Sequence, residues 1–269
     1  MLKYLEMSSE SPLNSYVRKF WILDNSESGL VATTKHALPN TCITIAIIHG
    51  DGLIIDFPNN PISIARGSYL VGEITKATGV MVLPYTKAFM VQLNPWAATL
   101  LSNCSFHELT NQFAAIADIN RELARSFIDI NVLDNKGTKQ QILKALELYL
   151  YPTGASTLIA SCFNLFESHS PFIPLKIAAL SDHTGYTVRG IEKKFRRHVG
   201  LTPKQAFTIM KVRSVVNELI SSTGNLSLTA LAYKYGYTDQ SHFTRSYFCI
   251  MDSLPSKFNK LQYILPLQT

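Results

Sequence analysis

Cysteine is scarce in this chain and is not arranged for metal binding or disulfide exchange. The 269 residues include four cysteines, far apart and in mostly apolar surroundings, and no two of them form a C-x-x-C pair. Buried free thiols in a reducing compartment are the simplest interpretation. The four are Cys42, Cys104, Cys162 and Cys249.

Long apolar runs are also missing. The longest candidate, Thr41 to Ile48, is far shorter than the roughly 20 residues that cross a bilayer as a helix. Acidic residues interrupt the first ten positions, where a signal peptide needs a continuous apolar core. The sequence therefore predicts a cytoplasmic protein that does not enter a membrane.

Common catalytic motifs are not found. The sequence has no G-x-S-x-G, no glycine-rich phosphate-binding loop and no paired-carboxylate motif. His36, His49, Glu73 and His107 are scattered and include no H-x-H pair. We therefore predict no catalytic residue, no metal and no cofactor.

Positive charge is concentrated in the last third of the chain. Residues 172–269 hold 13 Lys and Arg against 5 Asp and Glu, which is a net charge of +8. Residues 1–171 have a net charge of −2, so the overall +6 comes from the C-terminal third. This distribution is expected if that region alone contacts a polyanion.

The same region contains an internal repeat of a small-residue helix, a Gly-Tyr-Thr turn and a second helix. The first copy runs from Ile177 to Gly200 and the second from Leu228 to Phe248. Gly185 and Gly236 occupy equivalent places, 51 residues apart. A repeat at a fixed period is one supersecondary unit used twice. The pattern indicates a helix-turn-helix, which places its second helix in a DNA major groove.

In the first unit, Thr187 is a typical helix N-cap, and Ile191 and Phe195 form the inner face of the second helix. Arginine on the outer face can bind guanine in a bidentate manner, and Lys or Arg can contact phosphates. Glu192 either accepts a hydrogen bond from cytosine or pairs with Arg196, four residues further on. The predicted DNA contacts are Arg189, Glu192, Lys193, Arg196 and Arg197.

In the second unit, Asp239 is the expected N-cap, and Phe243 and Tyr247 form the inner face. Glutamine suits adenine, and Arg245 suits guanine or a phosphate. The predicted DNA contacts are Gln240, Ser241, Thr244 and Arg245.

Between the units, Thr202-Pro203 begins a long amphipathic pattern whose apolar residues run from Ala206 to Ile220. We expect one helix that holds the two units at a fixed separation. The units could then occupy successive major grooves, about 34 Å apart on one face of the DNA.

Three stretches, R-H-V-G-L-T-P-K, L-A-Y-K-Y-G-Y-T-D-Q-S-H-F-T-R and L-P-S-K-F, stand in register across both units. In these stretches, and over residues 172–261 as a whole, the sequence resembles the AraC/XylS family of bacterial transcriptional regulators. The resemblance implies a seven-helix domain with two DNA-binding units. It also implies control of promoters, usually as an activator, with RNA polymerase as a partner.

The end of the second unit departs from the family's pattern. Where the family has an aromatic residue, a basic pair and Phe-Gly, this chain has the segment Tyr247–Asp252, which lacks the basic residues and the glycine. We expect this end to be buried or to face a partner rather than the DNA backbone. Gly190 is expected to weaken the first recognition helix by about 1 kcal/mol relative to Ala.

The first 95 residues alternate short β-branched and aromatic runs with turns. Runs at about ten-residue spacing predict an antiparallel barrel or sandwich. Gly50-Asp51-Gly52 is the clearest hairpin signal. The predicted strands are Tyr16–Leu23, Cys42–His49, Leu53–Phe57, Ser68–Val71, Gly79–Leu83 and Ala88–Leu93.

After Pro95 the apolar residues recur every three or four positions, which predicts helices. The apolar faces of the last two could pack on each other, and we also expect them to offer a dimer face. The prolines in Ser168–Pro174 indicate a linker. The predicted helices are Trp96–Asn103, Asn120–Ile130, Lys139–Tyr151 and Ser156–Glu167.

The predicted fold class is therefore a two-domain α+β protein. Residues 1–170 form a sensor or association domain, with strands over about 15–95 and helices over about 96–168. Residues 171–269 form an all-α domain with helix-turn-helix units at about 174–200 and 226–252.

More weakly, A-L-P-N-T-C-I-T-I, Y-L-V-G-E-I-T and L-T-N-Q-F resemble the cupin-like sensor domains attached to such regulators. The resemblance implies a β-barrel or sandwich, whose interior could hold a small apolar or amphipathic effector. Each candidate lining residue could equally be ordinary core. The candidates are Trp21, Tyr69, Tyr85, Phe89 and Trp96.

Together these patterns predict a sequence-specific transcription regulator that binds double-stranded DNA and is modulated through its N-terminal domain. One alternative is a metal-dependent cupin enzyme with an accessory helical domain. Another is a regulator that senses no ligand and is controlled by a protein partner or by its own dimerisation.

Overall fold

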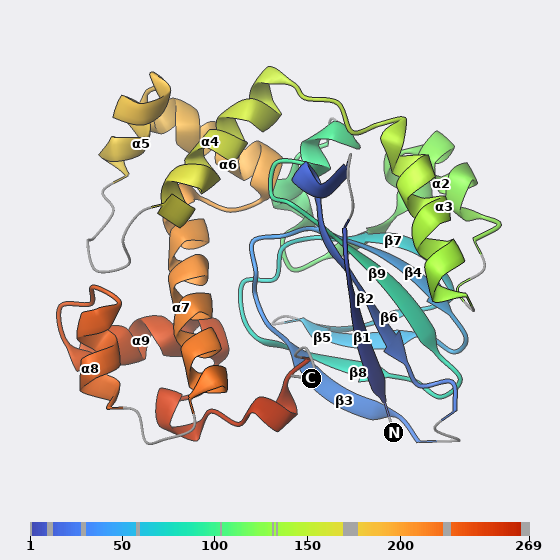
Figure 1. Cartoon of the computed structure of the whole chain (residues 1–269), viewed down its shortest axis with the longest axis horizontal. Coiled ribbons are helices and arrows are strands. Elements are labelled where there is room, and N and C mark those ends of the chain that lie inside the picture. Colours follow the sequence, from blue (N-terminus) through green and yellow to red (C-terminus); the bar gives the residue numbers. More distant parts are fainter. Residues whose placement is uncertain are drawn as a thin grey trace.

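A β-sandwich and a helical region lie side by side in the chain (Figure 1). The computed structural model describes residues 2–9, 13–27, 31–57, 60–102, 104–130, 132, 134–168, 177–222 and 227–264. From residue 169 onward, the predicted linker Ser168–Pro174 lies outside the described residues.

The sandwich consists of two antiparallel sheets that do not close into a barrel. The six-stranded sheet has the order β1 (Lys3–Ser8), β2 (Val17–Asp24), β9 (Lys87–Leu93), β4 (Thr44–His49), β7 (Gly67–Val71) and β10 (Phe113–Ala115). The four-stranded sheet has the order β3 (Thr33–Ala37), β8 (Thr78–Val82), β5 (Leu53–Phe57) and β6 (Asn60–Ile64).

Strand β9 shows how the sandwich is built, because all of its residues are buried. Ala88 and Met90 join the core between the two sheets, whereas Phe89 and Val91 join a second core on the other face of the six-stranded sheet. Alternate residues of a strand point to opposite faces, so a strand covered on both sides is apolar over most of its length.

The six predicted strands are confirmed within two residues at each end. Strands β1, β3, β6 and β10 were not predicted. Strand β3 reads T-T-K-H-A and has no fully buried residue, and β10 has only three residues. Such short or polar strands at the edges of sheets give little periodic signal.

The hairpin predicted at Gly50-Asp51-Gly52 is wrong. The turn does connect β4 to β5, but β4 pairs with β7 and β9 while β5 pairs with β6 and β8. The chain therefore crosses from one sheet to the other at this point. Gly50 has φ +88°, and a Cβ there would lie 2.0 Å from the carbonyl oxygen of Tyr85. The glycine signal thus reflects a close backbone approach rather than a tight hairpin.

Short helices cover the outer face of the six-stranded sheet. They share its core through buried residues that include Leu123, Phe127, Ile142 and Leu146. The predicted helix at Trp96–Asn103 contains a single 3-10 turn. The elements are η1 (Leu13–Ser15), η2 (Ala98–Leu100), η3 (Phe106–Leu109), α1 (Ile116–Ile119), α2 (Arg121–Phe127) and α3 (Asn135–Glu147).

Helix α4 (Gly154–Ser168) belongs to the core of the helical region, so the predicted packing of its apolar face on α3 is wrong. Its buried Phe163 stacks on Phe195 with ring centroids 5.8 Å apart, and Phe166 lies 5.4 Å from Phe207. The apolar face of α3 is covered by the sandwich instead. Most apolar residues of the two faces are thus buried within the chain, whereas Leu148 and Tyr151 remain exposed. A dimer face stays a prediction.

Seven helical segments follow α4 in the described part of the chain. They are α5 (Ala178–Thr184), α6 (Val188–Val199), α7 (Pro203–Ser221), α8 (Leu228–Lys234), α9 (Gln240–Met251), η4 (Pro255–Lys257) and η5 (Lys260–Gln262).

Both halves of the helical region contact the sandwich domain. At the end of α6, the Gly200 carbonyl oxygen accepts a hydrogen bond from Thr110 Oγ1 at 2.9 Å and lies 3.3 Å from His107 Nδ1. At the end of α9, the Ile250 carbonyl oxygen accepts from the Ala77 amide at 2.7 Å. The two units are therefore fixed to the sandwich at separate points.

The C-terminal segment makes a third contact. Tyr263 forms a parallel bridge with His36 of β3, and the Ile264 amide donates to the His36 carbonyl oxygen at 2.8 Å. Lys35 Nζ donates to the Leu261 carbonyl oxygen. The segment thus runs along the edge of the four-stranded sheet (Figure 1).

A C-terminal fragment that begins at residue 152 should be more stable than one that begins at residue 171. The shorter fragment lacks Phe163 and Phe166 and exposes the faces of Phe195 and Phe207 that they cover. We expect a difference of about 3 kcal/mol or more, typical of large buried aromatic groups. Urea unfolding followed by circular dichroism measures it, and equal free energies of unfolding would exclude a structural role for α4 in this domain.

Gly200→Ala in the full chain should destabilise the protein more than Gly185→Ala. Both glycines have positive φ (+88° and +73°), so both substitutions carry a backbone penalty of about 1–2 kcal/mol. Only at Gly200 would the new Cβ also meet the domain interface, 2.8 Å from the Phe106 carbonyl oxygen. Thermal unfolding of the two variants makes the comparison. Equal losses would contradict a close interface at Gly200.

Candidate nucleic-acid interface

The first helix-turn-helix unit has the geometry that its sequence predicts. Gly185 ends α5 in the left-handed region, and Thr187 precedes α6. The Thr187 hydroxyl accepts from the Gly190 amide at 3.1 Å, which confirms the predicted N-cap. Ile191 and Phe195 are fully buried, so the inner face is also confirmed.

The second unit repeats this arrangement. Gly236 has φ +61° in the turn, and Asp239 Oδ1 accepts from the His242 amide at 2.7 Å as the cap of α9. Phe243 and Tyr247 are fully buried, as predicted. The two copies thus share a left-handed glycine, a side-chain cap and an aromatic inner face.

Eight of the nine predicted DNA contacts are exposed, and Thr244 is half-buried. Glu192 and Arg196, both described side chains, form no ion pair with each other, so Glu192 keeps its capacity to accept from a base. Gln240 Oε1 accepts from Thr229 Oγ1 at 2.8 Å, and Arg245 Nε donates to the Ser241 carbonyl oxygen at 3.4 Å. Contact of these residues with DNA stays a prediction.

Lys194 is oriented differently from the predicted contacts on α6. Its Nζ lies 5.5 Å from the centre of the Tyr186 ring, in a cation–π arrangement within the turn of the first unit. A lysine held over the turn is less free to reach a phosphate than its neighbour Lys193.

Helix α7 holds the second unit through polar contacts. Lys211 Nζ lies 3.9 Å above the Tyr237 ring and donates to the Gly236 carbonyl oxygen at 3.1 Å. Further along α7, Glu218 accepts from Lys234 Nζ and from the Tyr235 hydroxyl, each at 2.8 Å. The hydrogen bond from Lys234 lowers the pKa of Glu218. The predicted connecting helix is therefore confirmed as α7. It forms hydrogen bonds with the turn and the first helix of the second unit.

The apolar end of α9 is buried on one side, as its sequence predicts. Ile250 and Met251 are 9% and 2% exposed, and they lie in the core of the helical region. Phe248 and Cys249 remain exposed. The free-thiol prediction holds for all four cysteines, but only Cys42 and Cys162 are fully buried. Burial raises the pKa of each of these two thiols to about 11, so both are protonated at neutral pH.

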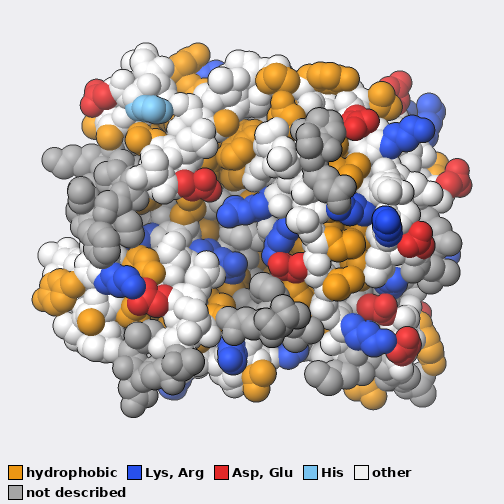
Figure 2. Space-filling model, in the orientation of Figure 1, with side chains coloured by type: hydrophobic (Ala, Val, Ile, Leu, Met, Phe, Trp, Pro, Cys, Tyr) orange, Lys and Arg blue, Asp and Glu red, His pale blue; other side chains and the backbone are white. Residues whose placement is uncertain are grey.

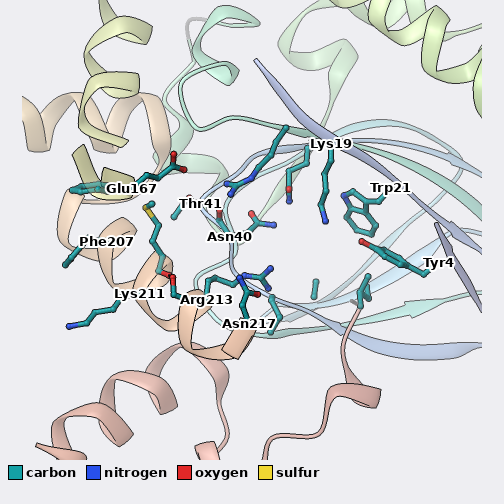
Figure 3. A pocket seen from close by; sticks show the side chains of 18 residues that line it. Tyr4, Lys19, Trp21, Asn40, Thr41, Glu167, Phe207, Lys211, Arg213 and Asn217 are labelled. Carbon is teal, nitrogen blue, oxygen red and sulfur yellow. Dashed lines mark hydrogen bonds between the residues drawn. The ribbon is translucent and has the colours of Figure 1, made fainter. Parts of the chain in front are cut away.

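A cavity of about 500 Å³ lies between the sandwich and the helical region (Figure 3). Strands β1 and β2 and the loop before β4 form one side, and α7 with the end of α4 forms the other. Of the five aromatic residues predicted to contact an effector, only Trp21 lines this cavity.

The other four aromatic candidates lie elsewhere. Phe89 is in the core under the helices, and Tyr85 is 54% exposed in the turn between β8 and β9. Tyr69 packs within the sandwich, and Trp96 Nε1 donates to the Ser15 carbonyl oxygen at 2.8 Å. The five do not gather because side chains fill the space between the sheets, where an open barrel would leave room. Ligand contact by these residues stays a prediction.

The scattered histidines and Glu73 do not converge on a metal site. His36 Nδ1 lies 3.3 Å from the Gln262 carbonyl oxygen, and His107 contacts Gly200. Glu73 is fully buried with no hydrogen-bond partner for its carboxyl among the described residues, and burial raises its pKa well above the usual range. No group of three or more His, Cys, Asp or Glu within the described ranges could hold a metal ion.

Comparison with known proteins agrees with this geometry. Residues 180–261 match a family model described as a helix-turn-helix domain, and residues 5–115 match a domain of unknown function, DUF6597. No curated protein sequence matches the chain. None of the helices in the described residues is long and apolar enough to cross a membrane.

Among solved structures, ToxT from Vibrio cholerae has 11% sequence identity and a TM-score of 0.47, over 96% of this chain and 96% of that chain. A probable AraC family transcriptional regulator from Rhodopseudomonas palustris has 24% identity and a TM-score of 0.35, over 40% of this chain and 98% of that chain.

Two capped helix-turn-helix units joined by one helix make up the region that matches the helix-turn-helix family model. The chain therefore contains a helix-turn-helix domain, preceded by a β-sandwich that matches a domain of unknown function.

Arg189→Ala and Arg245→Ala should each weaken binding to the cognate DNA site by about 1–3 kcal/mol and relax preference at one base pair. Both arginines are exposed on the outer faces of α6 and α9. Arg66→Ala, which removes an exposed arginine of the sandwich, is the matched control. Fluorescence anisotropy on cognate and random duplexes measures both effects. Wild-type discrimination by the two recognition-helix variants would show that these arginines do not contact bases.

Proposed function

We propose that the chain binds a specific DNA site by placing α6 and α9 in two successive major grooves. The most direct support is that the two units have the same geometry. In each, the polar face of the second helix, α6 or α9, is exposed. Helix α7 is fixed to the second unit by Lys211 and Glu218. Its Phe207 packs on Phe166 of α4, which also contacts Phe195 of the first unit. A rigid spacer of this kind suits two grooves about 34 Å apart.

We further propose that the N-terminal domain regulates DNA binding through its contacts with both units. Gly200 joins the end of the first recognition helix to η3, and Ile250 joins the end of the second to the segment before β8. A small-molecule effector that alters these contacts would change how the two helices are presented. We also propose that the protein acts in the cytoplasm. There it would activate transcription together with RNA polymerase, as the family resemblance implies.

DNA affinity should fall steeply as salt rises from roughly 50 to 200 mM. Lys193, Arg196 and Arg197 are exposed on α6, and cations that contact phosphates release condensed counterions. The slope of log affinity against log salt, measured by anisotropy, should be clearly negative for the full chain. A slope near zero would exclude phosphate contacts by these residues.

The footprint of the full chain on DNA should match that of the fragment from residue 152, because most apolar residues of the two helical faces that suggested a dimer are buried. DNase protection combined with sedimentation at tens of micromolar tests this. A full chain that sediments as a dimer and protects about twice the length of DNA would support the homodimer instead.

A further inference from the structure

The second helices of the two units, α6 and α9, can be compared residue by residue. Each has twelve residues, and each is capped by the side chain that precedes it. Aligning the two caps, Thr187 and Asp239, also aligns the left-handed residues that follow the helices, Gly200 and Asp252. The same alignment matches three buried pairs on the inner faces. They are Ile191 with Phe243, Phe195 with Tyr247 and Val199 with Met251.

The outer faces of the two helices differ in charge. Helix α6 has exposed Lys and Arg side chains along its length, whereas Arg245 is the one Lys or Arg among the twelve described residues of α9. In the alignment Arg245 matches Lys193, so this cation is present in both units. The next exposed pair differs, because Arg196 and Arg197 of α6 match Phe248 and Cys249 of α9.

Phe248 lies on the same side of α9 as two of the predicted DNA contacts. Ser241, Arg245 and Phe248 follow one another at spacings of four and three residues, which places them on one face of a helix. Phe248 is 46% exposed, whereas Tyr247 and Ile250 are buried in the core of the helical region. The buried residues fix which way the helix faces, and they leave the ring of Phe248 on the outer surface.

The surface around Phe248 is less polar than the outer face of α6. Over the second unit, at the lower left of Figure 2, hydrophobic side chains reach the surface beside charged ones. Cys249 is exposed next to Phe248, and Tyr233 of α8 is 62% exposed. The two units therefore have the same backbone geometry but present different chemistry to a duplex.

A phenyl ring cannot replace an arginine at a phosphate, because it has neither a charge nor a hydrogen-bond donor. Against the polar edge of a base, the ring would cover donors and acceptors without pairing with them, which is unfavourable. The major groove also presents an apolar group, the C5-methyl of thymine, which packs against apolar side chains such as Phe. Thymine is thus the base that best matches this ring.

We propose that Phe248 is a specificity-determining residue, whose ring packs against the C5-methyl group of one thymine in the DNA site. The inference rests on the DNA binding proposed above and names a base that the second unit selects. The two units then differ in role. Helix α6 contributes mainly charge-dependent affinity through cations such as Arg196, whereas α9 contributes more to the choice of sequence.

The test replaces single thymines by deoxyuridine, which removes the methyl group and leaves the hydrogen-bonding groups of the base unchanged. Duplexes are selected from a random library by the purified full chain. Each thymine of the selected site is then replaced in turn, and affinity is measured by fluorescence anisotropy. For the wild type, at least one replacement should weaken binding about 4-fold, the loss expected for one buried methyl group. A site in which no replacement weakens binding would overturn the proposal.

Substitutions at Phe248 assign that loss to its side chain. Phe248→Ala should bind the thymine and deoxyuridine duplexes equally at that position, and Phe248→Leu should keep part of the difference because leucine is also apolar. Tyr233→Ala, which removes another exposed aromatic side chain from the same unit, is the matched control and should keep the whole difference. If Phe248→Ala keeps the difference as well, the ring faces something other than this methyl group, such as a protein partner, and the proposal is wrong.

Phe248→Lys tests whether the position faces DNA at all. This variant places a cation where the first unit has Arg196, so the slope of log affinity against log salt should become steeper by about one. The preference for thymine over deoxyuridine should be lost at the same time. An unchanged slope together with an unchanged preference would show that the side chain at this position does not contact the duplex.

The selection step separates this inference from the proposed function. If the chain enriches specific sequences but no thymine methyl group affects binding, the DNA-binding function stands and the role of Phe248 is overturned. If the chain enriches no sequence at all, the proposed function fails and the inference about Phe248 fails with it.

Discussion

The orientation of the first recognition helix depends on a cluster of phenylalanines from three helices. Phe195 of α6 stacks on Phe163 of α4, and Phe166 of α4 contacts both Phe195 and Phe207 of α7. Protein interiors are close-packed, so rings in mutual contact leave little room for one helix to tilt alone. The outward face of α6 is therefore set partly by α4, a helix that lies outside the repeated units.

The same cluster positions α7, and contacts from α7 in turn position the second unit. Phe207 lies near the start of α7, whereas Lys211 and Glu218 hold the turn and first helix of the second unit. The distance between the two recognition helices is thus a property of one helix and its contacts. Any event that moves α7 relative to the sandwich affects both DNA-facing surfaces together.

Sequence patterns predicted the DNA-binding units almost completely, because their determinants are local. A cap such as Thr187 or Asp239, a left-handed glycine and an inner aromatic pair all fall within one helix-turn-helix. The six strands that were predicted could be recognised for the same reason, since each contains a local apolar run. Edge strands such as β3 carry polar residues, and the Gly50 turn gives the same signal whether or not the strands that it joins pair with each other.

Contacts between distant segments could not be predicted from periodicity. His36 and Tyr263, which form a parallel bridge, are 227 positions apart, and nothing near either residue signals the other. The apolar face of α4 was visible in the sequence, but its partner was not, because an amphipathic face does not specify what covers it. The aromatic candidates for an effector site failed to gather for a related reason: an aromatic residue in a strand serves a filled core as readily as an open cavity.

The bridge between Tyr263 and His36 also protects the sandwich from self-association. Strand β3 is an edge of the four-stranded sheet, and an unpaired edge offers backbone donors and acceptors to any other extended chain. The segment around Tyr263 occupies part of that edge, and Lys35 of β3 donates a hydrogen bond to its Leu261 carbonyl oxygen. A chain shortened before Leu261 would expose the edge and favour sheet-to-sheet aggregation, although both DNA-binding units would still be present.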